Sequence, residues 1–335
     1  MSQTRVESTL HELGNGLFAY IQGDGSWGWS NSGLIISGDE SLLIDTLFTG
    51  RLTSDMLREY RRVSPAAEQI DVLVNTHANG DHTFGNHMVG GARIIGSTAC
   101  MEEMNERPAE VFADLVMNWK NHGDVGAFLH ETMGQHFDFS DIAHVPPTEL
   151  FNGRRDITIG DRKIELHEMG PAHTRGDIIV HVPDAKTVYT GDILFSGGHP
   201  IVWAGPVQNW IDACDRILTW DVETVVPGHG PIGDKQAVRE MRHYLLHIYQ
   251  QSEQMFAAGL PWEEAAFLIG YDAFDSWLDR ERVVANVANI YRDLSKGAIV
   301  PDRAEIMRQM LRYRKGADCP HDAPCGCHSK KGNHA

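Results

Sequence analysis

The stretch Asp71-Val-Leu-Val-Asn-Thr-His-Ala-Asn-Gly-Asp-His-Thr-Phe-Gly-Asn86 joins a short apolar run to a turn rich in histidine, aspartate and glycine. A compact apolar run of this length is typical of a buried strand. Imidazole and carboxylate are the usual ligands of zinc and its first-row neighbours, and a tight glycine-containing loop can aim several of them at one point. We therefore expect a metal-binding turn at the end of a strand, with His77, Asp81 and His82 as candidate ligands.

Three further turns share this layout, because each contains glycine, follows a predicted strand and holds one candidate ligand. They are Gly170-Pro-Ala-His-Thr-Arg-Gly-Asp177 with His173, Tyr189-Thr-Gly-Asp-Ile-Leu-Phe195 with Asp192, and Val226-Pro-Gly-His-Gly-Pro231 with His229. A single loop histidine is more often a hydrogen-bonded structural residue than a ligand. Four such turns in one chain argue jointly for one metal centre.

The pattern of apolar residues along the chain predicts strands that alternate with helices. The predicted strands are 17–22, 33–36, 41–44, 71–75, 157–159, 163–167, 178–182, 187–190 and 224–226, and the predicted helices are 53–62 and 209–219. This alternation predicts a layered α/β fold rather than a helical bundle or a β-sandwich. We expect a catalytic domain over 1–233 with a helical insertion at 98–150, a helical region over 234–315 packed on it, and a Cys/His-rich tail at 316–335.

Taken together, the four turns resemble the motifs of the metallo-β-lactamase superfamily, and most closely those of its glyoxalase-II-like hydrolases. The matching features are an H-x-H-x-D-H motif, a lone histidine in a GPxHTxGD segment, a GD turn and a GH turn, from about Leu17 to Pro231. The resemblance implies a four-layer αβ/βα sandwich with two metal positions along its edge. It assigns His77 and His173 to the first metal, Asp81, His82 and His229 to the second, and Asp192 to a bridge between them.

The resemblance also implies the chemistry. A metal-bound hydroxide would attack an acyl carbon, and Asp81 and Asp192 are the expected catalytic carboxylates. Zinc is the expected ion, at one or two positions, with iron or manganese as the alternative. We therefore expect a metal-dependent hydrolase that cleaves a small ester, lactone, thioester or amide.

One position departs from the family pattern. Asn79 stands where the family has the second histidine of the first motif, and an amide oxygen is a weaker donor to zinc than imidazole. Asn79 is either a metal ligand or a structural residue of the turn. The departure puts occupancy of the first metal position in question.

Two other functions remain open at this point. A mononuclear iron oxidoreductase of the persulfide-dioxygenase type would need only a set of two histidines and one carboxylate, which His77, His173 and Asp192 supply. A binding protein that has lost activity is disfavoured by the near-complete ligand set. Metal identity separates the first alternative from the hydrolase.

The composition restricts the partners and the compartment. A formal net charge of −17 opposes binding to nucleic acid, so a small molecule is the expected substrate. The sequence contains no long apolar run and its amino terminus lacks the layout of a secretory signal, so we expect a cytoplasmic protein without membrane association. Homodimer formation is left open. Three of the five cysteines lie in the tail, which we expect to be either disordered or an accessory metal site.

Four residues outside the motifs are candidates for the pocket. Trp27 and Trp29 could form an apolar wall or simply pack. Met133 lies in the helical insertion, where methionines more often belong to the core, although the insertion could cover the metal edge as a lid. His199 could touch substrate, but a surface loop is the favoured interpretation.

Overall fold

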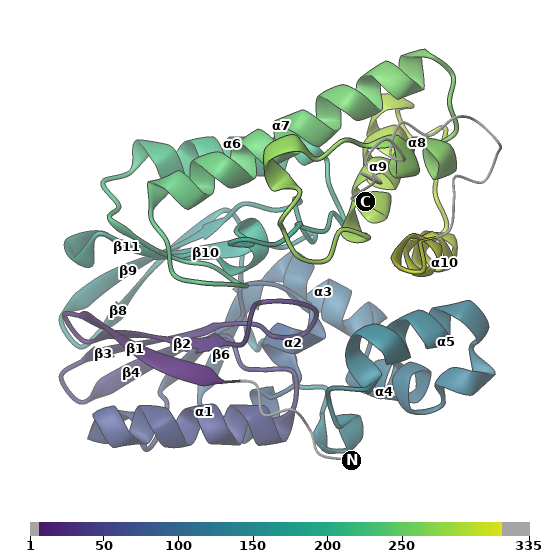
Figure 1. Cartoon of the computed structure of the whole chain (residues 1–335). Helices are drawn as coiled ribbons and strands as arrows, with labels where there is room; N and C mark the ends of the chain where they lie inside the picture. Colours follow the sequence, from purple (N-terminus) through teal and green to yellow (C-terminus); the bar gives the residue numbers. More distant parts are fainter. Residues whose placement is uncertain (1–6, 317–335) are drawn as a thin grey trace, which may run out of the picture.

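Two β-sheets lie face to face in the computed structural model, which describes residues 7–316 (Figure 1). The first sheet holds seven strands in chain order: β1 (Ser8–Gly14), β2 (Leu17–Gln22), β3 (Ser32–Ser37), β4 (Glu40–Ile44), β5 (Val72–Val74), β6 (Arg93–Ser97) and β7 (Glu149–Phe151). The second holds β12 (Thr224–Val226), β11 (Thr187–Tyr189), β10 (Ile178–Val182), β9 (Arg162–Glu168) and β8 (Arg154–Ile159), in that order. The strands from β4 to β7 pair in parallel, as do β11 and β12, whereas the other neighbours are antiparallel.

Helices cover the outer faces of both sheets, with α1 on the first sheet and α6 and α7 on the second (Figure 1). The α-helices are α1 (Gly50–Val63), α2 (Gly80–Thr83), α3 (Thr98–Glu106), α4 (Ala109–Met117), α5 (Gly123–Leu129), α6 (Val207–Thr219), α7 (Lys235–Ala257), α8 (Trp262–Leu268), α9 (Arg282–Leu294) and α10 (Arg303–Arg314). The order of layers is therefore helix, sheet, sheet, helix.

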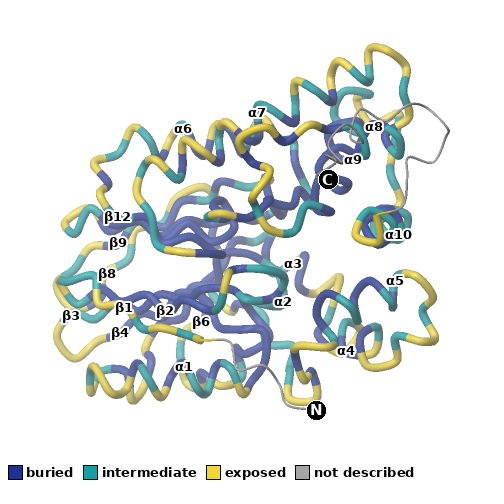
Figure 2. Tube along the Cα trace, in the orientation of Figure 1, coloured by how far each residue is buried: buried dark blue, intermediate teal, exposed yellow. Residues whose placement is uncertain are grey.

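Alternating apolar side chains hold these layers together, because successive residues of a strand point to opposite faces. In β2, Leu17 belongs to the cluster between the two sheets, whereas Phe18 packs toward α1. In β10, Ile178 faces the first sheet and Ile179 faces the helices on the second. Buried residues therefore fill both sheets and the inner sides of the helices (Figure 2). The predicted four-layer sandwich is confirmed.

Helix α1 shows how the sequence sets one of these layers. The hydroxyl of Thr49 accepts a hydrogen bond from the Leu52 amide at 3.2 Å, which caps the start of the helix. Met56, Leu57 and Tyr60 lie on one face at helical spacing and are buried against the first sheet. Burial of this apolar face fixes the helix on the sheet.

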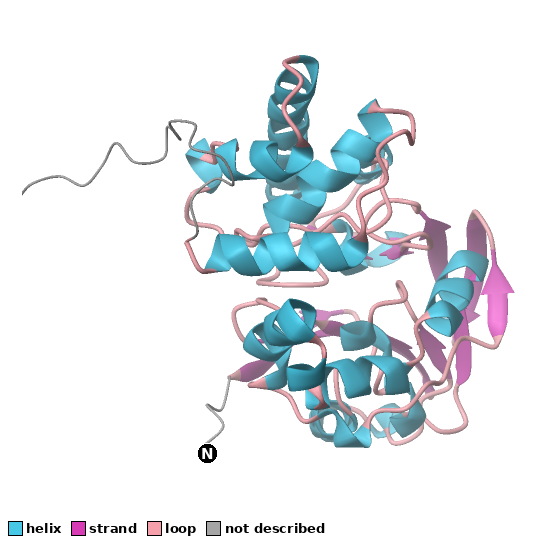
Figure 3. Cartoon of the chain, turned by 90° about the vertical axis from the view of Figure 1, so that its right-hand side faces the viewer, coloured by secondary structure: helices cyan, strands magenta, loops and turns pink. Residues whose placement is uncertain are grey.

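Helices from two distant parts of the chain meet on the right-hand side of Figure 1. The insertion between β6 and β7 contributes α4 and α5, and α10 from the carboxyl-terminal region packs on α5. Helices cover much of this side of the molecule (Figure 3). The helical content of 98–150 and 234–315 agrees with the sequence pattern, and the domain boundaries stay a prediction.

Several features were not predicted. The sequence pattern missed strands β1, β6 and β7, and it gave no separate bounds for helices α8 and α10 within the predicted helical region. His199 is fully buried and its Nδ1 lies 2.9 Å from the Tyr244 hydroxyl, so the interpretation as a surface-loop residue was wrong. The Cys/His-rich tail lies outside the described residues, apart from Gly316. Within the described chain no helix is long and apolar enough to cross a membrane.

Candidate metal centre

The turns that follow four strands bring the six candidate ligands to one edge of the sandwich. Strand β5 leads to the turn with His77, Asp81 and His82, the β9–β10 connection holds His173, and β11 and β12 lead to Asp192 and His229. All are buried except Asp81, whose side chain is 15% exposed. A buried group of histidines and carboxylates at strand ends is a rigid platform for a cation.

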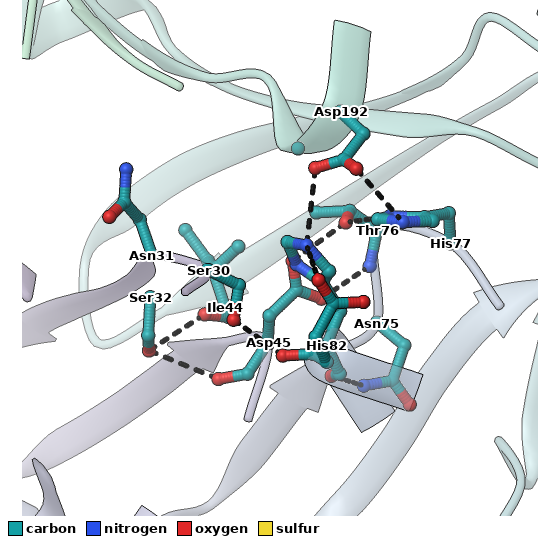
Figure 4. Close-up of polar contacts among 12 residues, drawn as sticks. Ser30, Asn31, Ser32, Ile44, Asp45, Asn75, Thr76, His77, His82 and Asp192 are labelled. Carbon is teal, nitrogen blue, oxygen red and sulfur yellow. Dashed lines mark hydrogen bonds and ion pairs between the residues drawn. The ribbon is translucent and has the colours of Figure 1, made fainter. Parts of the chain in front are cut away.

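Asp192 lies at the middle of this group. Its Oδ2 lies 3.2 Å from Nε2 of His173 and 3.6 Å from Nε2 of His77. The same oxygen is 3.5 Å from Nε2 of His229, and Oδ1 is 3.1 Å from Nε2 of His82. The carboxylate therefore faces all four histidines at once, and Figure 4 shows its contacts with His77 and His82.

The remaining distances divide the ligands into two sets. His77, His173 and Asp192 form one set whose ligand atoms lie close enough to hold one ion. Asp81, His82 and His229 form the second, with 3.3 Å between Oδ2 of Asp81 and Nε2 of His229. These sets coincide with the two metal positions that the resemblance implied.

Hydrogen bonds to the other ring nitrogen orient every histidine. Nδ1 lies 2.9 Å from the Thr76 hydroxyl in His77, 2.9 Å from Oδ2 of Asp45 in His82, 2.6 Å from the Ile201 carbonyl in His173 and 3.1 Å from the Gly25 carbonyl in His229. When Nδ1 donates to an oxygen, Nε2 of a neutral ring keeps its lone pair. All four rings therefore present Nε2 to the centre, as metal-binding histidines do.

Buried polar atoms at the centre fit a cation. Within residues 7–316, Nε2 of His77, Nε2 of His82 and Oδ1 of Asp192 are buried and make no hydrogen bond, although Oδ1 of Asp192 lies 3.1 Å from Nε2 of His82. Such atoms are costly unless something pairs with them. Their convergence, with the nitrogen and oxygen donors of the set, fits a divalent metal ion.

The protonation of the histidines follows their surroundings. Burial lowers the pKa of His77, and positive charge on His82 lowers it further. Burial also opposes charge on His82, but the carboxylates of Asp192 and Asp81 outweigh it and raise its pKa. The surroundings of the second set are therefore the more negative. They favour a bound proton and a bound metal ion alike.

Asn79 lies beside the first set. Its Nδ2 is 2.9 Å from Nε2 of His173. The side chain caps no backbone amide of α2, although Asn79 occupies the N-cap position. Rotation of the amide by 180° would present the oxygen to the same point. Asn79 is therefore within reach of a metal in the first set, and its role stays a prediction.

Two motif glycines allow the turns to approach each other. A Cβ on Gly228 would lie 2.0 Å from Oδ1 of Asp192, so no larger residue fits there without movement. Gly191 has a φ of 50°, and its Cβ would lie 2.5 Å from the Thr76 hydroxyl. These contacts explain why glycine precedes each of the two ligands, Gly191 before Asp192 and Gly228 before His229.

Sequence reasoning missed two carboxylates that position the ligands. Asp45 follows β4 directly and accepts hydrogen bonds from both the amide and the hydroxyl of Thr76, at 2.7 and 2.6 Å, besides contacting His82. Asp177 accepts hydrogen bonds from the Thr174 amide and hydroxyl, which order the loop of His173. Asp45 could have been found, because it is a polar residue at the end of a predicted strand.

A pocket of about 920 Å³, including its open mouth, leads to the centre. Its lining includes Asn79, Asp81, His173, Asp192 and His229. Aromatic and aliphatic side chains from loops, from the insertion and from the carboxyl-terminal helices form most of the wall: Trp27, Phe48, Phe84, Phe112, Phe128, Leu129, Met133, Phe195, Ile201, Trp203 and Met307. The pocket therefore suits a small substrate with apolar surface.

The family model of the metallo-beta-lactamase superfamily matches residues 25–229, which is more than half of the chain. The chain belongs to this superfamily, so the predicted resemblance to the superfamily is confirmed. The closer likeness to glyoxalase-II-like hydrolases stays a prediction.

Curated relatives agree with this family. An acyl-coenzyme A thioesterase of Homo sapiens, MBLAC2, is 25% identical over 248 residues, which are 70% of this chain and 85% of the thioesterase. A probable metallo-hydrolase of Methanocaldococcus jannaschii, MJ0888, is 25% identical over 224 residues, covering 63% of this chain and 93% of the relative. These similarities support a metal-dependent hydrolase.

Solved structures show the same fold. A metallo-beta-lactamase from Pontibacter korlensis aligns with a TM-score of 0.54 at 18% identity, covering 72% of this chain and 99% of that one. The sec-alkylsulfatase Pisa1 from Pseudomonas sp. aligns with a TM-score of 0.61 at 15% identity. This alignment covers 88% of the chain, which spans about half (52%) of the sulfatase.

Proposed function

We propose that the protein hydrolyses a small ester, lactone, thioester or amide with the help of one or two divalent metal ions, zinc being the proposed ion and iron or manganese the alternative. The observation that carries the proposal is the convergence of four Nε2 atoms and the Asp192 carboxylate at the base of an apolar pocket. A bound divalent ion would polarise a substrate carbonyl and acidify water.

The residues would divide the work as follows. His77, His173 and Asp192 would hold one ion, with Asn79 beside them, and Asp81, His82 and His229 would hold the other. Asp81 is the more accessible carboxylate and lines the pocket, so it would accept a hydrogen bond from the attacking water and orient it toward the substrate. Asp192 is buried and would fix the relative position of the two ligand sets.

The test is hydrolysis by protein purified without added metal, with the bound ions identified and counted. Thioesters belong first in the substrate panel, because a relative is an acyl-coenzyme A thioesterase. Esters, lactones and amides of similar size complete it. Zinc with turnover that needs no oxygen supports the proposal, whereas no turnover of any member by fully metal-loaded protein contradicts it.

One observation favours the iron oxidoreductase as a second candidate. His77, His173 and Asp192 form a buried set of two histidines and one carboxylate, which is a ligand set of mononuclear iron enzymes. Iron as the bound metal, with oxygen consumption during turnover, would favour it over hydrolysis. A small-molecule substrate and a cytoplasmic location stay predictions from the sequence. Whether the protein forms a homodimer stays open.

A further inference from the structure

The wall of the pocket includes residues that the family match does not cover. Arg282 at the start of α9, and Arg303 and Met307 on α10, line the pocket although they lie beyond residue 229. Helix α10 packs on α5 of the insertion and so lies over the same side of the pocket. These residues are features of this chain rather than of the shared family region.

The three arginines of the pocket differ in their partners. Arg107 is 3.9 Å from a carboxylate oxygen of Glu103, and Arg282 is 2.9 Å from Asp279. Arg303 has no ion-paired carboxylate anywhere in residues 7–316. Its guanidinium lies instead over the ring of Trp203, 4.1 Å from the ring centroid.

Helix stability does not account for an arginine at this position. Arg303 is the first residue of α10, directly after the N-cap Asp302. The start of a helix carries partial positive charge, so a cation there is unfavourable for the helix. A partly buried guanidinium that faces an apolar wall also lacks the solvation it has in water. An anion bound in the pocket would compensate both the partial positive charge at the start of α10 and the charge of the Arg303 guanidinium.

Trp203 connects Arg303 to the metal centre. The Trp203 amide donates a hydrogen bond to the His173 carbonyl at 2.9 Å. Two residues earlier, the Ile201 carbonyl lies 2.6 Å from Nδ1 of His173. The short segment that orients a candidate ligand therefore also carries the ring under Arg303, so an anion held by Arg303 lies beside the centre.

We propose that Arg303, stacked on Trp203, binds an oxyanion group of the substrate, such as a carboxylate or sulfonate that is not the scissile group. The preferred substrates are then esters or thioesters with an apolar body and a negative charge at a second position. The aromatic wall takes the apolar body, and Arg303 fixes which end of the substrate approaches Asp192. This inference rests on the proposed hydrolytic function, but binding tests it without turnover.

The experiment compares two probes of the same shape by calorimetric titration of the metal-loaded protein. The probes are 2-naphthalenesulfonate and its uncharged counterpart, methyl 2-naphthyl sulfone. A charge-assisted hydrogen bond corresponds to about tenfold or more in affinity, so we expect the sulfonate to bind wild-type protein about tenfold more tightly. The substitution Arg303→Gln should bring the two affinities together.

The matched control is Arg308→Gln, on the same helix. Arg308 pairs with Glu305 at 2.7 Å and does not line the pocket, so this variant should keep the preference. Bound metal is measured in each protein, to show that the centre is intact. No preference in the wild type, no binding of the sulfonate, or a preference that survives Arg303→Gln would overturn the inference. If the wild type prefers the sulfonate, Arg303→Gln removes that preference and no ester is turned over, only the proposed hydrolytic function is contradicted.

Discussion

Two clusters of buried histidines with a carboxylate occur on the second sheet or at its edge, and they differ in what surrounds them. One is the metal centre around Asp192. The other lies on the sheet itself, where Glu165 and His167 of β9 are neighbours of His181 on β10. There Oε2 of Glu165 is 3.2 Å from Nε2 of His167 and 3.3 Å from Nδ1 of His181. By distance alone, both clusters could hold an ion.

The hydrogen bonds separate them. In the sheet cluster, Arg216 lies 3.0 Å from Nδ1 of His167, and a guanidinium can only donate, so Nε2 carries the proton that His167 donates to Glu165. Arg154 and Lys163 also contact the other oxygen of Glu165, at 2.9 and 3.4 Å. Protein cations thus already neutralise this cluster. At the metal centre all four rings instead direct Nε2 toward the Asp192 carboxylate, so grouping of ligand types alone does not define a metal site.

The largest effect is expected from Asp192→Ala. Asp192 contacts histidines of both sets, so its removal should abolish turnover and release metal from both positions. The measurements are metal content after gel filtration and turnover of the best substrate. Wild-type metal content in this variant would contradict the assignment of Asp192 as a shared ligand.

A smaller effect is expected from Asp45→Asn, because Asp45 contacts His82 from outside the ligand set. Loss of such an orienting carboxylate typically costs about 10- to 100-fold in metal affinity or activity. Competition with a chelator measures the change. Asp71→Asn is the control. Asp71 lies next to the opposite end of β5, and its carboxylate accepts a hydrogen bond from the Ser41 amide. Equal metal affinities in the two variants would show that the contact with His82 has no such role.

The substitution Asn79→His makes the first set more like the second by adding an imidazole. If the amide is what weakens the first position, zinc affinity or stoichiometry should rise there by a measurable amount. Turnover need not rise, because the acidity of bound water depends on the metal and its ligands. Metal titration of both proteins under the same chelation tests this. Unchanged affinity and stoichiometry would place Asn79 outside the ligand set.

The sequence was most informative where local order and function coincide. His77, Asp192 and His229 lie in glycine turns directly after short apolar strands, so an apolar run followed by such a turn was enough to predict one metal centre from them. Strand β6 was missed although it is almost fully buried, because its residues, Arg93-Ile-Ile-Gly-Ser97, include only two large apolar side chains.

The wall of the pocket could not be derived in the same way. Arg303 lies more than a hundred residues after Asp192, and only the packing of α10 on α5 brings it to the pocket. The sequence left two roles open for Trp27, packing and substrate contact. In the structure Trp27 lines the pocket, and its indole donates a hydrogen bond to Glu281 at 2.8 Å. Such positions depend on how helices dock, and no local pattern in the sequence records this.

The smallest effect is expected from His181→Gln. His181 stacks on Trp220 and contacts Glu165, and the sheet cluster is already neutralised by arginine and lysine. The variant should therefore keep wild-type metal stoichiometry and turnover, with a modest loss of stability of about 1 kcal/mol from the lost buried contact. Metal analysis and denaturant unfolding measure the two quantities.

The metal stoichiometry of His181→Gln tests whether hydrogen-bond direction is enough to distinguish a metal site from a histidine cluster that holds no metal. An ion at the sheet cluster would require Nε2 of His167 to lose its proton, and Nδ1 would then have to give up its hydrogen bond from Arg216. Arg216→Gln replaces a guanidinium that can only donate with an amide that can also accept a hydrogen bond from Nδ1. The double variant His181→Gln with Arg216→Gln is therefore compared with Arg216→Gln alone. Loss of one equivalent of metal in His181→Gln would contradict the argument. Gain of metal by Arg216→Gln, reversed in the double variant, would show that the arginine is what keeps a cation out.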